Sequence, residues 1–123
     1  MFLGLRSVIY HAPDLAAAKQ WYARALGVEP YFDQPFYVGF NIAGYELGFD
    51  PDPNSATGTG ASAIAYWGVE NAEAALARLV ELGATDRGGI QDVGGDIRMA
   101  SLSDPFGNIF GIIENPHFSL EQT

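Results

Sequence analysis

The two halves of the chain repeat one order of elements, and this repeat constrains the fold more than any other feature. Each half begins with a strand-like segment, 3–10 or 62–69, followed by apolar residues at helical spacing over about 14–26 or 71–82. Further strand-like segments follow at 29–33, 36–41 and 44–50 in the first half and at 88–93, 97–102 and 109–114 in the second. Each half therefore reads βαβββ. Because one such module cannot bury both faces of a curved sheet, we expect the two to pack together around a cleft.

The residues that start and stop the elements also match between the halves. Asp14 and Asn71 stand where a helix N-cap accepts backbone N–H groups, and Gly27 and Gly83 stand where each helix ends. The loop-forming run PDPNSATGTG separates the halves. The prediction is an α+β fold of two tandem βαβββ modules whose curved mixed sheets surround a cleft. It forms one domain over 1–123, with module 1 at about 1–50, a linker at 51–61 and module 2 at about 62–116.

Composition limits the function. A chain of 123 residues with 48% hydrophobic residues forms one ordinary core, and the lack of cysteine excludes disulfides, thiol nucleophiles and Cys-metal sites. The formal charge of −9 argues against nucleic acid or an anionic membrane as a partner and favours a cationic one. No segment is typical of a signal peptide or a membrane span, so the expected location is the cytoplasm.

Two motifs carry a family resemblance across nearly the whole chain. The first combines Asp14-Leu15, Trp21-Tyr22 and Leu26-Gly27, and the second is Asp104-Pro105-Phe106-Gly107-Asn108 before the last strand. Together with the duplicated βαβββ order, they resemble the vicinal oxygen chelate superfamily. That group includes glyoxalases, bleomycin-resistance proteins, fosfomycin-resistance enzymes and extradiol dioxygenases. The resemblance implies the glyoxalase/bleomycin-resistance fold and, since such proteins often dimerise, a homodimer.

The resemblance also places the metal ligands of the superfamily's enzymes on this sequence. The four positions fall on Ser7, Glu46, Ile64 and Gly111, so only Glu46 retains a ligating side chain. A divalent metal needs three or more protein groups, and borderline ions favour the imidazoles that these positions lack. We therefore expect a metal-independent protein with no cofactor.

Strand alternation predicts which side chains share the face of those four positions. Tyr37 joins that face if the predicted strands 36–41 and 44–50 form an even-length hairpin. Arg98 joins it if Asp104–Gly107 is a four-residue turn. The predicted ligand-binding residues are Ser7, His11, Tyr37, Glu46, Tyr66 and Arg98. The residues expected on the opposite, helix-facing side, as core, are Trp21, Tyr22, Trp67 and Phe110.

Glu46 is the strongest candidate, because a carboxylate on an apolar face can bind a cation or a hydroxyl group, or act as a base. Each other candidate has a structural alternative. Tyr37 and Tyr66 can be core residues, His11 can be a solvated loop residue, and Arg98 can form a surface salt bridge.

The preferred interpretation is a small-molecule-binding protein of the glyoxalase/bleomycin-resistance type whose ligand is cationic or hydroxylated. One alternative is an enzyme of the same superfamily, a lactoylglutathione lyase-like lyase or isomerase, or a dioxygenase, with a modified site. Glu46 is then the catalytic candidate. The other alternative is a non-catalytic subunit with a vestigial pocket.

Overall fold

A computed structural model of the chain describes residues 1–55 and 63–120. They divide into two compact units. The α1 unit comprises the described residues of Ser7–Ile64 together with Leu120, and the α3 unit comprises Met1–Arg6 and Ala65–Ser119. The first six residues belong with the second half of the sequence, and there the Leu3 N–H donates to the Gly68 carbonyl over 2.8 Å. Much of the predicted linker, 56–61, lies outside the described residues.

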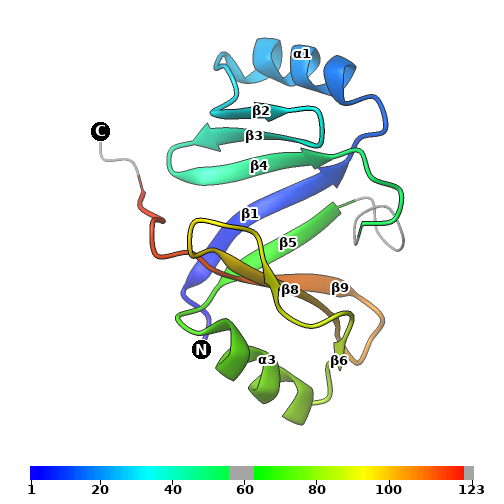
Figure 1. The fold of residues 1–123 in the computed structure, drawn as a ribbon, viewed down its shortest axis with the longest axis vertical. Helices are drawn as coiled ribbons and strands as arrows, with labels where there is room; N and C mark the ends of the chain where they lie inside the picture. Colours follow the sequence, from blue (N-terminus) through cyan, green and yellow to red (C-terminus); the bar gives the residue numbers. More distant parts are fainter. Residues whose placement is uncertain (56–62, 121–123) are drawn as a thin grey trace. The chain divides into compact units, whose positions relative to one another are not determined.

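The α1 unit contains one helix and a four-stranded mixed sheet (Figure 1). Its elements are β1 (Gly4–His11, which begins in the other unit), α1 (Leu15–Leu26), β2 (Phe32–Gln34), β3 (Tyr37–Ile42) and β4 (Tyr45–Asp50). The strands lie in the order β2-β3-β4-β1, with β4 parallel to β1 and the other neighbours antiparallel. The first predicted βαβββ module is confirmed.

The α3 unit repeats this arrangement. Its elements are β5 (Ala63–Gly68, which begins in the other unit), α3 (Ala72–Glu81), β6 (Thr85–Asp86), β7 (Gln91–Asp92), β8 (Arg98–Ser103) and β9 (Ile109–Glu114). The order is β5-β9-β8-β6, with β7 also pairing with β8. As in the first module, the first and last strands are parallel and the hairpin is antiparallel. The α+β fold with two βαβββ modules is therefore confirmed, although two short strands replace the predicted strand 88–93.

The predicted caps define both helices. The Asp14 side chain accepts from the Ala17 N–H over 3.0 Å, and the Asn71 side chain accepts from the Ala74 N–H over 2.9 Å. Gly27 ends α1 with φ 74°, a left-handed conformation that glycine adopts without steric cost. Local sequence therefore fixes the helix ends independently in each half.

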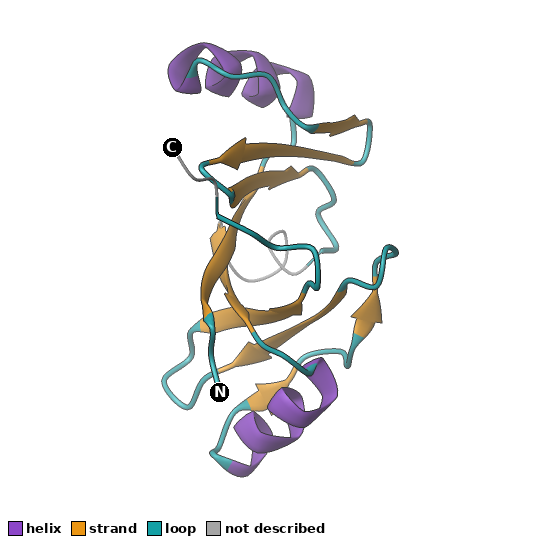
Figure 2. Ribbon diagram, turned by 90° about the vertical axis from the view of Figure 1, so that its left-hand side faces the viewer, coloured by secondary structure: helices purple, strands orange, loops and turns teal. Residues whose placement is uncertain are grey.

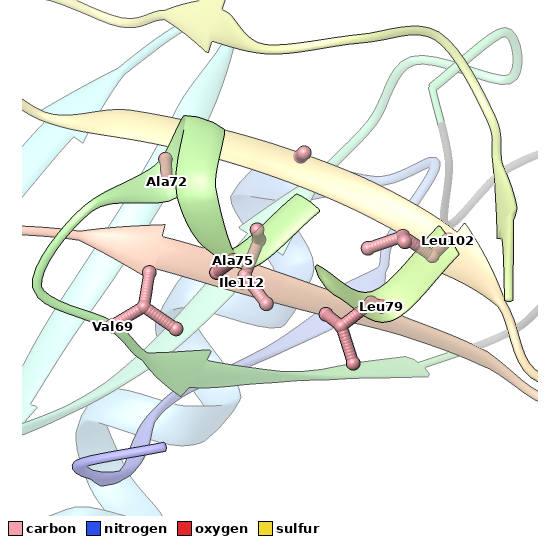
Figure 3. Packing of buried hydrophobic residues seen from close by; sticks show 7 residues of the cluster. Val69, Ala72, Ala75, Leu79, Leu102 and Ile112 are labelled. Atoms are coloured by element: carbon pink, nitrogen blue, oxygen red, sulfur yellow. The ribbon is translucent and has the colours of Figure 1, made fainter. Parts of the chain in front are cut away.

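Each helix covers one face of the sheet in its own unit, as Figure 2 shows. Helix α3 buries Ala72, Ala75 and Leu79 against Leu102 and Ile112 of the sheet (Figure 3). In the α1 unit the fully buried cluster is Val38, Phe40 and Phe49, and partly buried side chains of α1 pack on it, among them Leu15, Tyr22 and Leu26. Each sheet thus has an apolar face under a helix and a second face that the helix does not cover.

The aromatic residues predicted as core behave differently from one another. Tyr22 packs on the buried cluster of the α1 unit, Phe110 packs on that of the α3 unit, and Trp67 stacks on Phe2 at 5.2 Å between ring centroids. The prediction for Trp21 is wrong, because its side chain is 56% exposed. Trp21 directly precedes the inward Tyr22, and consecutive helical residues point about 100° apart.

Neither described helix is long and apolar enough to cross a membrane.

Candidate functional site

The sheet face of the α1 unit that helix α1 leaves uncovered collects most of the predicted site residues. Ser7 lies opposite Glu46 and Ile9 opposite Gly48 across β1 and β4, and Gly39 lies opposite Gly48 across the β3–β4 hairpin. The β3–β4 hairpin is therefore even, which is the condition under which Tyr37 was expected on this face. By strand alternation, the face holds Ser7, Ile9, His11, Tyr37, Gly39, Asn41, Glu46, Gly48 and Asp50.

Glu46 is the centre of the polar contacts on this face. Its side chain is half-buried, and its carboxylate accepts a hydrogen bond from the Tyr31 hydroxyl. Withdrawal of that hydroxyl from solvent raises the pKa of Tyr31, and the charge and hydrogen bond of Glu46 raise the pKa further. Tyr31 therefore keeps its proton and donates to Glu46 throughout the neutral pH range.

The backbone around Gly39 positions this pair. The Tyr31 N–H donates to the Gly39 carbonyl over 3.0 Å, which fixes the residue just before β2 beside β3. A Cβ added at Gly39 would lie 3.0 Å from the Glu46 carboxylate and 3.0 Å from the Tyr31 ring. Glycine at this position therefore leaves the space in which the two side chains meet.

Tyr37 lies across Gly48 on the same face. A Cβ added at Gly48 would stand 1.7 Å from the Tyr37 hydroxyl oxygen and 2.5 Å from the ring carbon that bears it. The Tyr37 side chain thus takes the space that a side chain at position 48 would otherwise fill. Its ring forms part of the surface of this face, as strand alternation predicts.

Two further predicted residues add polar atoms. Ser7 is only 5% exposed and lies opposite Glu46. His11 lies opposite Asp50 at the end of β1, and its buried Nδ1 atom has no hydrogen-bond partner among the described residues. A buried polar atom normally has a partner, so a ligand that contacts this nitrogen would satisfy it.

Tyr66 belongs to the α3 unit, on the face of the sheet that α3 leaves uncovered. It lies opposite Gly111 across β5 and β9 and is 8% exposed. A Cβ added at Gly111 would stand 2.2 Å from two carbons of the Tyr66 ring. The ring therefore occupies the space that a longer side chain at position 111 would need.

The structure corrects the prediction for Arg98. The connection between β8 and β9 contains five residues, Asp104–Asn108, because Ser103 lies opposite Ile109. One extra residue reverses the predicted alternation, so Arg98 lies opposite Glu114 on the α3-facing side of the sheet, where it forms a 2.5 Å ion pair with Glu73. The salt-bridge alternative is therefore the one that the structure supports.

Tyr31 was not predicted as a site residue. Alternation assigns a face only within a strand, and Tyr31 precedes β2, whose start lies three residues later than the predicted strand. Its pairing with Glu46 depends on the backbone contact to Gly39, which no local sequence pattern encodes.

The sequence model of the Glyoxalase/Bleomycin resistance protein/Dioxygenase superfamily matches residues 4–112. The chain belongs to this superfamily. Solved structures of the superfamily fold agree. A methylmalonyl-CoA epimerase in complex with methylmalonyl-CoA and NH4+ superposes with a TM-score of 0.78 at 14% identity, covering 99% of this chain and 100% of that one.

Two further structures show the same similarity of fold. The methylmalonyl-CoA epimerase from Mycobacterium tuberculosis has a TM-score of 0.71 at 17% identity, covering 91% of this chain and 87% of that one. A glyoxalase/bleomycin resistance protein/dioxygenase superfamily member from Vibrio splendidus has a TM-score of 0.65 at 15% identity, covering 89% of this chain and 97% of that one. None of the curated proteins matches the sequence.

The residues present do not fit the metal of the superfamily's enzymes. Of the four expected positions, Ile64 and Gly111 have no donor atom in the side chain, and the Tyr66 ring fills the space beside Gly111. Ser7 offers a neutral hydroxyl, while Glu46 already accepts from Tyr31. Within residues 1–55 and 63–120, no three His, Asp or Glu side chains group closely enough to hold a metal ion. The uncovered face of the α1 unit instead offers a carboxylate, two phenols and a buried imidazole nitrogen.

Proposed function

We propose that this superfamily member binds a small cationic or hydroxylated organic molecule directly, without a metal, on the uncovered face of the α1 unit. The observation that carries the proposal is the Tyr31–Glu46 hydrogen bond on that face. It holds a half-buried carboxylate in one position, with the remaining lone pairs of its oxygens available to a donor from a ligand.

The composition of this face supports recognition of a small molecule. Ile9 and the glycines at 39 and 48 make an apolar floor, while the Tyr37 ring covers part of it. Polar side chains, among them Ser7 and Glu46, surround this floor, and small-molecule sites combine an apolar lining with polar groups that orient the ligand. The Nδ1 atom of His11, which is buried and has no hydrogen-bond partner among the described residues, is a second polar atom on this face.

The charge of the protein favours a donor-rich or cationic ligand over an anion. The chain carries 15 acidic side chains against 6 basic ones. Among the described residues, the one basic side chain of the α1 unit that forms an ion pair is Lys19, and it pairs with Asp33 rather than with Glu46. The negative charge of Glu46 is thus left for a ligand to balance.

A thermal-shift screen of small cationic and polyhydroxylated compounds tests the proposal. The proteins compared are the wild type, Glu46→Gln, Tyr31→Phe and the control Glu29→Gln, which removes the same charge at an exposed position of the same unit. For a compound that stabilises the wild type, Glu46→Gln is expected to weaken binding by about 1.5–3 kcal/mol, the range for hydrogen bonds to charged groups. Tyr31→Phe is expected to weaken it less, because only the orientation of the carboxylate is lost.

The control variant is expected to bind as the wild type does. Equal binding by the wild type and Glu46→Gln would contradict the proposal. A screen in which no compound stabilises the wild type would favour a vestigial pocket instead.

An enzyme of the superfamily with a modified site is the second candidate. The observation in its favour is that Glu46, within the described part of the chain, accepts a hydrogen bond and forms no ion pair, as a general base requires. The two candidates differ in one measurement. If Glu46 acts as a base, a bound ligand exchanges a carbon-bound proton with deuterated solvent in the wild type and not in Glu46→Gln, whereas a binding protein leaves the ligand unlabelled.

A further inference from the structure

Arg6 lies in the α3 unit in a setting unlike that of the other basic residues. Its side chain is half-buried and follows the sheet beside Gly68, where an added Cβ would stand 2.6 Å from the Arg6 Nε atom and 2.9 Å from the guanidinium carbon. Only glycine at position 68 leaves this space. The ring of Phe118 stacks on the guanidinium, with 3.7 Å from its central carbon to the ring centroid.

Within residues 1–55 and 63–120, no ion pair joins this guanidinium to a carboxylate. Lys19, Arg78 and Arg98 each pair with an acidic side chain. Arg24 and Arg87 are exposed. Among the described residues, Arg6 is therefore the one basic side chain that is both half-buried and without an ion pair, in a protein with a formal charge of −9.

This setting suits recognition of an anion. A guanidinium binds a carboxylate or phosphate through two parallel N–H donors on its edge, and stacking on an aromatic ring fixes its plane while leaving that edge available. A half-buried cation that has an aromatic ring beside it but no carboxylate among the described residues gains from an anionic ligand. The glycine at 68 and the ring of Phe118 therefore act together to hold the guanidinium in place.

We propose that Arg6 binds the carboxylate of a small organic acid in the α3 unit, with the apolar part of the acid against Phe118. A monocarboxylate fits better than a phosphate, because the strongly negative protein opposes a dianion more than a singly charged ion. The ring of Phe118 provides an apolar surface that inorganic phosphate cannot use. This site is distinct from the one proposed around Glu46, and its ligand has the opposite charge.

A titration of the full chain with benzoate, followed by amide-resolved NMR, tests the proposal. Benzoate is expected to shift the resonances of Arg6, Gly68 and Phe118. Its dissociation constant is expected to rise about tenfold or more in Arg6→Gln, as for loss of a hydrogen-bonded charge. The matched control Arg87→Gln, which removes an unpaired exposed cation, is expected to leave the constant unchanged.

Arg6→Lys keeps the charge and the fold if Arg6→Gln does not fold, and it is expected to weaken benzoate binding several-fold because the paired donors are lost. Equal affinity of the wild type and either Arg6 variant would overturn the proposal. It would also be overturned by the absence of any saturable benzoate binding, or by inorganic phosphate binding more tightly than benzoate.

Discussion

The two modules share one topology but differ in what lies on the face that the helix leaves uncovered. In both, a tyrosine ring rests on a glycine of a neighbouring strand, Tyr37 on Gly48 and Tyr66 on Gly111. The α1 unit then adds a carboxylate, Glu46, whereas the α3 unit adds the guanidinium of Arg6. The repeated fold fixes where rings and glycines meet, while single residues decide the charge of each face.

The two helices also differ in how deeply they bury leucine side chains, and this difference predicts the largest effect of a substitution on stability. Leu79 of α3 is buried, whereas Leu26 of α1 is only partly buried. Leu79→Ala is expected to lower the free energy of unfolding by about 2–5 kcal/mol, through lost apolar contact and a residual cavity. Leu26→Ala is expected to cost less than half as much. Urea denaturation of both variants measures the difference, and equal losses would show that α1 is packed as tightly as α3.

The contacts of the Tyr66 and Tyr37 rings with Gly111 and Gly48 predict the second largest effect on stability. Gly111→Ala places a Cβ against the middle of the buried Tyr66 ring and is expected to cost about 1–3 kcal/mol of stability. Gly48→Ala is expected to cost less, because the half-buried Tyr37 meets the new methyl with the far end of its ring. Combining Gly111→Ala with Tyr66→Ala removes the clash. The two costs measured by urea denaturation would then be less than additive, and strict additivity would contradict the contact.

The helix caps are a feature that both modules share, and they predict a smaller effect. Asp14→Ala and Asn71→Ala each leave a backbone N–H of the first turn without its acceptor, at a cost of about 1 kcal/mol. Asn71→Ala is expected to cost the less of the two, because Glu114 also accepts from the Ala72 N–H of α3 over 2.8 Å. Thermal unfolding of both variants checks the order, and a larger loss for Asn71→Ala would reverse it.

The turns of the β3–β4 and β8–β9 hairpins predict the smallest effect, which is a difference in how stability depends on pH. In the α3 unit, hydrogen bonds from the side chain and backbone of Asn108, and from the Phe106 N–H, lower the pKa of Asp104. A lowered pKa stabilises the folded state above the ordinary carboxyl range, and this stabilisation is lost as the pH falls through the folded value. The β3–β4 turn uses the amide of Asn41, which accepts from the Gly44 N–H and does not titrate.

We therefore expect Asp104→Asn to have a lower free energy of unfolding than the wild type at neutral pH. This difference in free energy is expected to become smaller at acidic pH. Asn41→Ala is expected to differ from the wild type by the same amount at both pH values. Urea denaturation at neutral and acidic pH measures both differences. A constant difference for Asp104→Asn would show that its carboxylate does not stabilise the turn.

Local sequence patterns predicted the helices and strands, because helix caps and strand alternation depend only on residues close together in the sequence. Asp14 and Asn71 cap the helices from the adjacent position. The family resemblance gave Ser7 and Glu46, which the structure pairs across β1 and β4, and alternation within these strands gave the residues that share their face. The β3–β4 hairpin has the even register on which the placement of Tyr37 depended. The fold and much of the candidate site were therefore accessible from the sequence.

Residues whose position depends on the length of a turn, or on contacts between segments distant in the sequence, were not predictable from local patterns. One extra residue in the turn before β9 moved Arg98 to the other face of its sheet. Tyr31 reaches Glu46 only because its backbone pairs with Gly39, eight positions along the chain. Arg6 received no role, because its contacts to Gly68 and Phe118 join segments far apart in the sequence.

The central claim is that the uncovered face of the α1 unit binds a cationic or hydroxylated ligand through Glu46. An amide-resolved NMR titration with the best compound of the thermal-shift screen tests it most directly. The shifts are expected to concentrate at Ser7, Gly39, Glu46 and Gly48, and to be lost in Glu46→Gln but not in Glu29→Gln. Shifts confined to residues outside this face, or shifts that persist unchanged in Glu46→Gln, would contradict it.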